Sequence, residues 1–137
     1  MKIIKNKLDN NLKKIIYDGF EEYSIEKIGE SGIEDPISFY IEDSFGNIIS
    51  AVVCNVFHGS LHIKYVWTHK DHRNKGYAIN LMKEAFDFAI EREFPFAFVE
   101  TMNYQAPAFY QKLGFEIEFI REGYSHSSSF YYMRKDF

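Results

Sequence analysis

The sequence has little of the features that mark secreted and membrane-bound proteins. It contains a single cysteine, Cys54, so no disulfide can form within the chain, which is typical of a reducing compartment. No apolar run approaches the length of a membrane span, and the polar segment Met1–Lys7 lacks the apolar core of a signal peptide. We therefore expect a cytoplasmic protein with no membrane association.

The charged residues argue against a further class of partner. Lys and Arg form no long block and the formal net charge is −4, which disfavours a general nucleic-acid-binding protein and suits a cationic substrate better. The length of 137 residues suits one domain, and a hydrophobic content of 46% with 18% aromatic residues is ample for a packed core. We predict a single domain over residues 1–137.

The most informative stretch covers residues 65–89. Tyr65–Trp67 has the aromatic and β-branched character of a buried strand, and from Ala78 onward apolar residues recur at helical spacing. Between them, Arg73–Ala78 forms a basic turn that contains a glycine. The first amides of a helix have no intrahelical partner and lie at the positive end of the helix dipole, and Gly76 leaves room for a ligand beside the backbone. This turn is therefore a candidate anion site.

The turn alone does not define a function, because a helix N-terminus with solvated basic side chains has the same pattern. It matches neither the Walker pattern nor the three-glycine dinucleotide fingerprint. However, residues 73–78 read Arg-x-x-Gly-x-Ala, and residues 103–115 read Asn-x-x-Ala-x-x-x-Tyr followed by Lys-Leu-Gly-Phe. In this order and separation, the two motifs resemble those of the GNAT superfamily of acetyl-coenzyme A-dependent N-acetyltransferases. The resemblance covers Val66–Phe115.

Hydrophobic periodicity predicts the other elements of the fold. The expected strands and helices, in chain order, are an edge strand at Met1–Lys7, a helix with an apolar face from Leu12 to Tyr23 capped by Asp9 or Asn10, strands at Ile37–Glu42, Ile48–Phe57 and Leu61–Trp67, the long helix from Ala78, a strand at Phe96–Val99, a helix at Ala106–Leu113, and strands at Phe115–Phe119 and Phe130–Met133. We predict an α/β fold with a mixed, mostly antiparallel central sheet of six to seven strands and helices on both faces. The resemblance implies that the fourth and fifth strands splay apart.

The resemblance also implies acetyl-coenzyme A as co-substrate, bound in the gap between the splayed strands. Val66 and Thr68 would contact the pantetheine arm through their backbone, and Asn103 would hydrogen-bond the coenzyme through its side-chain amide. The pyrophosphate would rest on backbone amides of the basic turn, whose residues are Arg73, Asn74, Lys75, Gly76, Tyr77 and Ala78.

The reaction implied is attack of an unprotonated amine on the thioester through a tetrahedral intermediate. Tyr110 matches the motif tyrosine, and a phenol with a pKa of about 10 stays protonated at neutral pH and can act as general acid. No motif marks the general base, for which Glu100 and His69 are candidates and His62 is a weaker one. A backbone amide near Thr68 is the candidate oxyanion donor.

Neither the histidines near the turn nor Cys54 suggests other chemistry. His69 and His72 lie three residues apart beside cations, which is more typical of a surface than of a metal site, so we expect no metal. Cys54 lies in an apolar strand without a local histidine and is expected to be a buried structural thiol.

We therefore predict an N-acetyltransferase that uses acetyl-coenzyme A and a small-molecule or peptide amine. No motif marks the acceptor site. Position and polarity suggest a set of residues that could line it, namely Tyr17, Glu21, Glu22, Tyr23, Tyr124 and His126. Two alternatives stay open, a non-catalytic acyl-coenzyme A sensor and a phosphate-binding enzyme unrelated to coenzyme A. The aromatic segment Phe130–Tyr132 is the candidate edge for pairing with a second copy in a homodimer.

Overall fold

The structure, a computed structural model, describes the whole chain, residues 1–137, as two compact units, residues 1–34 and 35–137, which are considered separately. The first unit contains α1 (Asn10–Ile28), and the side chain of Asp9 caps it by accepting a hydrogen bond of 2.7 Å from the amide of Leu12, as predicted. The strand predicted at Met1–Lys7 is wrong, because a strand needs a hydrogen-bonded neighbour and none pairs with these residues. The single domain over residues 1–137 stays a prediction.

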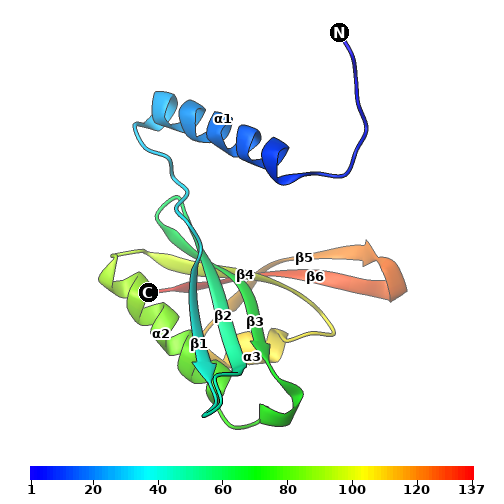
Figure 1. Ribbon diagram of the computed structural model, residues 1–137. Helices are drawn as coiled ribbons and strands as arrows, with labels where there is room; N and C mark the ends of the chain where they lie inside the picture. The colour runs from blue at the N-terminus through cyan, green and yellow to red at the C-terminus, as the bar shows by residue number, and fades with distance from the viewer. The chain divides into compact units, whose positions relative to one another are not determined.

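The second unit is built on a six-stranded sheet with the order β1-β2-β3-β4-β6-β5 (Figure 1). Its elements are β1 (Ile37–Glu42), β2 (Ile48–Phe57), β3 (Ser60–Thr68), η1 (Lys70–His72), α2 (Tyr77–Glu91), β4 (Phe96–Met102), α3 (Pro107–Lys112), β5 (Glu116–Tyr124), η2 (Ser125–Ser127) and β6 (Ser128–Asp136). Every pairing except β3–β4 is antiparallel. The predicted α/β class with a mixed, mostly antiparallel sheet is confirmed.

The parallel pairing between β3 and β4 is short. It joins Leu61 with Ala97, His62 with Phe98 and Ile63 with Val99, and it ends there. Residues 64–68 of β3 therefore have no partner in β4, although β3 stays paired with β2 up to Thr68. An unpaired stretch in the middle of a sheet leaves backbone donors and acceptors available to a ligand.

A β-bulge at Lys64 changes which residues of β3 point toward the core. Cys54 of β2 pairs with Ile63 while Val53 pairs with Tyr65, so Lys64 is the extra residue. Before the bulge, Leu61 and Ile63 are buried. After it, the inward positions shift by one residue, and the exposed Tyr65 points outward. This bulge was not predicted from the sequence.

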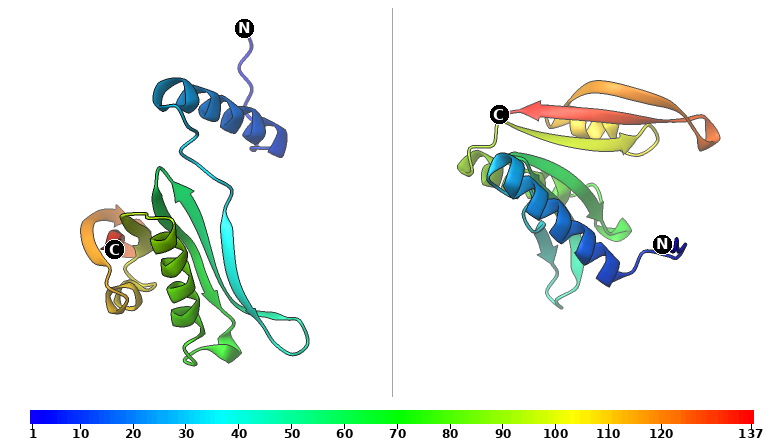
Figure 2. Two further views of the ribbon diagram at one scale, coloured as in Figure 1. Left: turned by 90° about the vertical axis from the view of Figure 1, so that its left-hand side faces the viewer. Right: turned by 90° about the horizontal axis from the view of Figure 1, so that it is seen from above.

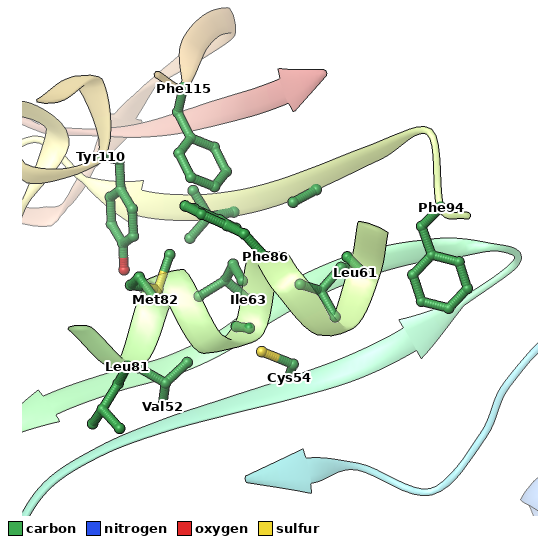
Figure 3. Close-up of a cluster of buried hydrophobic side chains, with 14 of the residues drawn as sticks. Val52, Cys54, Leu61, Ile63, Leu81, Met82, Phe86, Phe94, Tyr110 and Phe115 are labelled. Atoms are coloured by element: carbon green, nitrogen blue, oxygen red, sulfur yellow. The ribbon is translucent and has the colours of Figure 1, made fainter. Parts of the chain in front are cut away.

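The core of this unit lies between the sheet and α2, which packs against β1, β2, β3 and β4 (Figure 2). We call this side of the sheet the core face and the other side the back face. Figure 3 shows apolar side chains of β2, β3, α2 and the segment around α3 meeting in one cluster. Cys54 is fully buried there, and burial raises the pKa of its thiol to about 12, in agreement with the predicted structural role.

The last two strands form a long hairpin, visible in Figure 1. β6 pairs with β4 on one side and with β5 on the other, so the suggested pairing of Phe130–Tyr132 with a second copy is wrong. These residues have no open edge; the edge strands of the sheet are β1 and β5. None of the helices in the chain has the length and apolar character that a membrane-spanning segment needs.

Candidate active site

A cleft of about 730 Å³ runs from the N-terminus of α2 to the unpaired end of β3 and to α3. We call it the α2 cleft. It brings together eight of the residues predicted for the site, Val66, Thr68, Arg73, Asn74, Gly76, Tyr77, Ala78 and Tyr110. It is also lined by residues that the sequence analysis did not select, among them Trp67, His72, Gln105, Phe109 and Lys112. Its volume lies within the usual range for ligand sites, about 300 to 1,000 Å³.

The N-terminus of α2 leaves its backbone amides free of side-chain caps. Gly76 occupies the cap position with a φ of 79°, and no side chain accepts a hydrogen bond from the first turn. The first helical hydrogen bond runs from the amide of Asn80 to the carbonyl of Gly76 at 3.1 Å. Asn74 also has a positive φ, 61°, which asparagine tolerates better than most residues and which turns backbone amides into an anion-binding concavity.

The charges around the α2 cleft are of one sign. Arg73 and Lys112 line it, and no aspartate or glutamate does, although the chain as a whole carries a net charge of −4. The Nε of Arg73 donates to the carbonyl of Thr68 at 3.2 Å, which fixes the guanidinium beside the turn. Cations and free amides without nearby carboxylates form a donor set that fits a polyanionic ligand such as a diphosphate.

The unpaired edge of β3 also opens toward the α2 cleft. His69 donates from its amide to the carbonyl of Ile49 at 2.8 Å. Antiparallel residue pairs alternate between exchanging hydrogen bonds and exchanging none, and Val66 and Thr68 occupy the second kind of pair with β2. Their backbone N–H and C=O groups therefore point away from β2, toward the side on which β4 no longer pairs with β3.

Tyr110 of α3 is held in the core but keeps access to the α2 cleft. The residue is 7% exposed, and its ring packs edge-on against Phe115 (Figure 3). Its hydroxyl makes no hydrogen bond to the protein, and no buried side-chain oxygen or nitrogen lacks a partner, so the hydroxyl is in contact with the cleft. Burial, and to a smaller extent Cys54, raises the pKa of Tyr110 to about 12.

Four predicted residues, Lys75, His69, Asn103 and Glu100, lie outside the α2 cleft. Lys75 does not line it. His69 precedes η1 as its N-cap, and its Nδ1 accepts a hydrogen bond of 3.2 Å from the amide of Asp71. Asn103 lies in a separate hollow with Tyr124 and His126, and its Oδ1 accepts from the amide of Ser129 at 3.0 Å, so its carbonyl ties the loop after β4 to β6.

Glu100 lies on the back face of the sheet. Along β4 the buried residues Ala97, Val99 and Thr101 alternate with half-buried ones, and Glu100 belongs to the second set. Its carboxylate accepts a hydrogen bond of 2.6 Å from Nε2 of His62, and this bond is the main reason that the pKa of Glu100 is lowered. The pair thus joins β3 and β4 next to the last paired residues.

Glu100 also lines a second hollow, of about 370 Å³, which we call the back-face hollow. Other lining residues include Phe57, Phe98, Glu118, Tyr132 and Arg134. This hollow was not predicted, because its walls come from five strands whose order in space is not visible in the sequence.

The fold resembles that of solved acetyltransferases. An acetyltransferase from Bacillus cereus matches with a TM-score of 0.81 and 22% identity, over 99% of this chain and 98% of that one. A provisionally assigned acetyltransferase from Agrobacterium tumefaciens matches with a TM-score of 0.89 and 23% identity, over 100% and 99%. A provisionally assigned streptothricin acetyltransferase from Bacillus anthracis, in complex with acetyl coenzyme A, matches with a TM-score of 0.67 and 23% identity, over 76% and 64%.

Two sequence comparisons agree with this likeness. The chain is 25% identical over 113 residues to acetyltransferase Atu2258 of Agrobacterium fabrum, which is 82% of each protein. Residues 8–115 match the model of the acetyltransferase (GNAT) family. Together with the fold, this match defines an acyltransferase. The chain belongs to the GNAT acetyltransferase family, as the motifs in the sequence predicted.

Proposed function

We propose that the protein transfers an acetyl group from acetyl-coenzyme A to a primary amine, which attacks the thioester directly. The main support is that one cleft combines the uncapped amides of α2, the unpaired backbone of β3 and the hydroxyl of Tyr110. An extended ligand with a diphosphate at one end and a thioester at the other would meet all three.

The residues of the α2 cleft would hold the coenzyme by charge and backbone hydrogen bonds. The amides from Gly76 to Ala78, with Arg73 beside them, suit the pyrophosphate. Both backbone groups of Val66 and the N–H of Thr68 suit the amides of the pantetheine arm, whereas the carbonyl of Thr68 already accepts from Arg73. Lys75 would act as a nearby cation from outside the cleft, and Asn103 keeps an amide nitrogen free to donate while its carbonyl binds Ser129.

Tyr110 would protonate the departing sulfur. Acetyl-coenzyme A supplies an activated acetyl group whose leaving atom is a sulfur that must end as a thiol. Because the pKa of Tyr110 is raised to about 12, its hydroxyl carries a proton throughout the neutral range. The same burial disfavours a thiolate beside it, which favours transfer of the proton to the sulfur.

Direct attack fits the side chains present better than an acyl-enzyme does. The only cysteine, Cys54, is fully buried, and its pKa of about 12 keeps it a thiol rather than a nucleophilic thiolate. The amine therefore needs a base of its own. Glu100 is our candidate, because it is ionised at neutral pH and lies beside the residues where β3 and β4 part.

His69 remains a second candidate for the base. Its Nδ1 is engaged by the amide of Asp71, but Nε2 is available and the residue directly follows β3. Glu100→Gln and His69→Gln separate the two candidates: the variant that lacks the base should lose turnover while its affinity for acetyl-coenzyme A is unchanged. Release of coenzyme A, followed with a thiol reagent, measures turnover.

Two measurements on the unmodified chain test the proposed function. Calorimetry with acetyl-coenzyme A should show binding that is much weaker for an adenosine nucleotide without the pantetheine arm. Release of thiol should then depend on an amine from a panel of small amines and peptides. Binding without turnover of any amine would favour a sensor of acyl-coenzyme A, and equal binding of the truncated nucleotide would favour a different phosphate-binding enzyme.

A further inference from the structure

The back-face hollow begins at the one place where β3 and β4 are joined by a side-chain hydrogen bond. His62 and Glu100 meet at 2.6 Å beside the last paired residues of these strands. The ring of His62 is stacked on Phe98 with centroids 4.5 Å apart, which holds the imidazole in place. Tyr110 belongs to the cluster on the core face, so the carboxylate and the phenol lie on opposite faces of the sheet.

The walls of the back-face hollow are mostly apolar. Phe57, Phe98 and Tyr132 line it, and the rings of Phe57 and Phe98 lie edge to face with centroids 6.2 Å apart. Its volume of about 370 Å³ is near the lower end of the range for sites that bind small molecules. Such a hollow suits a compact ligand with an apolar body.

The charges of the back-face hollow favour a cation. Glu100 and Glu118 line it, and Glu118 forms no ion pair within the chain. The only lysine or arginine in the lining, Arg134, is already engaged, since its Nε donates to Asp136 at 2.8 Å and its guanidinium lies 3.9 Å from the ring centre of Phe96. The α2 cleft, by contrast, has basic side chains and no carboxylate.

We propose that the back-face hollow is the acceptor site, and that it takes a small primary amine with an apolar body and no carboxylate. This inference rests on the proposed function, because the amine is identified through the acetyl transfer. The ammonium would lie at Glu100, with the apolar body along Phe57 and Tyr132. Glu100 accepts one proton from the ammonium and later releases it to solvent, and the nitrogen lone pair so freed attacks the acetyl carbon to form a tetrahedral intermediate. When this intermediate collapses, the bond to sulfur breaks, Tyr110 gives its proton to the sulfur, and the second proton of the nitrogen restores the Tyr110 hydroxyl.

Binding of a fluorinated probe tests this site without depending on turnover. In ¹⁹F NMR titrations of the protein saturated with coenzyme A, 4-fluorophenethylamine should bind at least tenfold more tightly than 4-fluorophenylalanine. The two differ by the carboxylate, which Glu100 and Glu118 would repel. Putrescine, a dication without an apolar body, should compete poorly with the fluorinated amine. Equal affinity for the two fluorinated probes, or efficient competition by putrescine, would overturn the proposal.

Two pairs of variants locate the binding. Glu118→Gln should weaken the binding of 4-fluorophenethylamine about threefold, the size expected for one exposed charge, whereas Glu122→Gln on the same strand should not. Phe57→Ala should weaken it about tenfold, whereas Phe45→Ala, at a turn residue outside the hollow, should not. If the two variants of either pair weaken binding equally, the amine does not bind in the back-face hollow.

Calorimetry with acetyl-coenzyme A separates failure of this inference from failure of the proposed function. If the protein binds acetyl-coenzyme A and turns over amines, but Phe57→Ala and Glu118→Gln behave as their controls do, the acceptor lies elsewhere and only the inference fails. If acetyl-coenzyme A does not bind, the proposed function fails, whatever the fluorinated amine does.

Discussion

The two ends of the β3–β4 pair use the same backbone chemistry in different ways. At the closed end, Leu61–Ile63 and Ala97–Val99 pair with each other, and Leu61 and Ala97 are fully buried. At the open end, Val66 and Thr68 direct their backbone groups into the α2 cleft, close to the N-terminus of α2. Satisfied backbone and buried side chains stabilise the fold, whereas unsatisfied backbone is available for binding. Substitutions at the two ends should therefore change different measured quantities.

The largest effect is expected at the closed end. Leu61→Ala should lower the free energy of unfolding by about 3 kcal/mol, because Leu61 is fully buried and a cavity would remain in the core. Urea denaturation measures it. Val66→Ala at the open end, where the side chain is only half-buried, should cost less than half as much. Equal losses in the free energy of unfolding for the two variants would contradict the proposed difference between the closed and the open end.

The second-largest effect is expected on turnover, from a substitution at Tyr110 in the α2 cleft. Tyr110→Phe should lower turnover about 100-fold, the usual contribution of a general acid, and leave the affinity for acetyl-coenzyme A unchanged. Steady-state release of coenzyme A and calorimetry measure the two quantities. Tyr104→Phe, at a tyrosine that is 70% exposed on the loop before α3, is the matched control and should change neither. Normal turnover in Tyr110→Phe would remove the general-acid role.

A smaller effect is expected at the N-terminus of α2. Gly76→Asp should weaken acetyl-coenzyme A binding about 30-fold, or about 2 kcal/mol, because a carboxylate would occupy and repel the anion site. Gly76 has a φ of 79°, which Asp and Asn tolerate better than other side chains, so Gly76→Asn is the neutral control. Equal losses in both variants would show that the backbone, and not the charge, is responsible.

The smallest effect is expected on the pH dependence of stability, from a substitution at Glu100, which directly follows the last residue of β4 that pairs with β3. The hydrogen bond from His62 lowers the pKa of Glu100 below 4.5, so the folded state binds this proton less tightly than the unfolded state does. The pair therefore contributes stability above pH 4.5 that is lost as the pH falls through the folded-state pKa. Compared with the unmodified protein, Glu100→Gln should lose less stability on acidification, by up to about 1 kcal/mol.

Urea denaturation over a series of pH values measures this difference. The exposed Glu116→Gln on β5 is the control, because Glu116 forms no ion pair in the structure. An acid dependence in Glu100→Gln that equals that of the unmodified protein would contradict the stabilising role of the His62–Glu100 pair.

Local patterns in the sequence predicted the parts of the fold that depend on near neighbours. Asp9 was named as a possible cap, α2 follows from its apolar spacing, and a helix was predicted at Ala106–Leu113, where α3 lies. The edge strand expected at Met1–Lys7 failed because no other strand lies beside this segment to pair with it. The open edge assigned to Phe130–Tyr132 failed because β6 lies inside the sheet, between strands that precede it in the chain.

The features of the candidate site also divide into those that depend on near neighbours in the sequence and those that depend on the register between strands. The turn around Gly76 is local, and its residues were sufficient to predict helix amides without a side-chain cap, as observed at the start of α2. The anion site itself stays a prediction. The hydrogen bond between His62 and Glu100 joins residues that are 38 positions apart, and no periodicity relates them. The bulge at Lys64 leaves only a weak trace, in that the inward positions change from odd to even numbers along β3. Both features depend on the register between strands, which follows from packing of the whole sheet.

The burial of Cys54 has a practical consequence for every assay of this protein. A thiol that is fully enclosed and stays protonated reacts slowly with disulfide reagents and alkylating agents. Since the chain has no other cysteine, the native protein should give almost no background colour with a chromogenic disulfide. Each equivalent of signal then reports one molecule of released coenzyme A, and a sudden protein-derived signal reports unfolding.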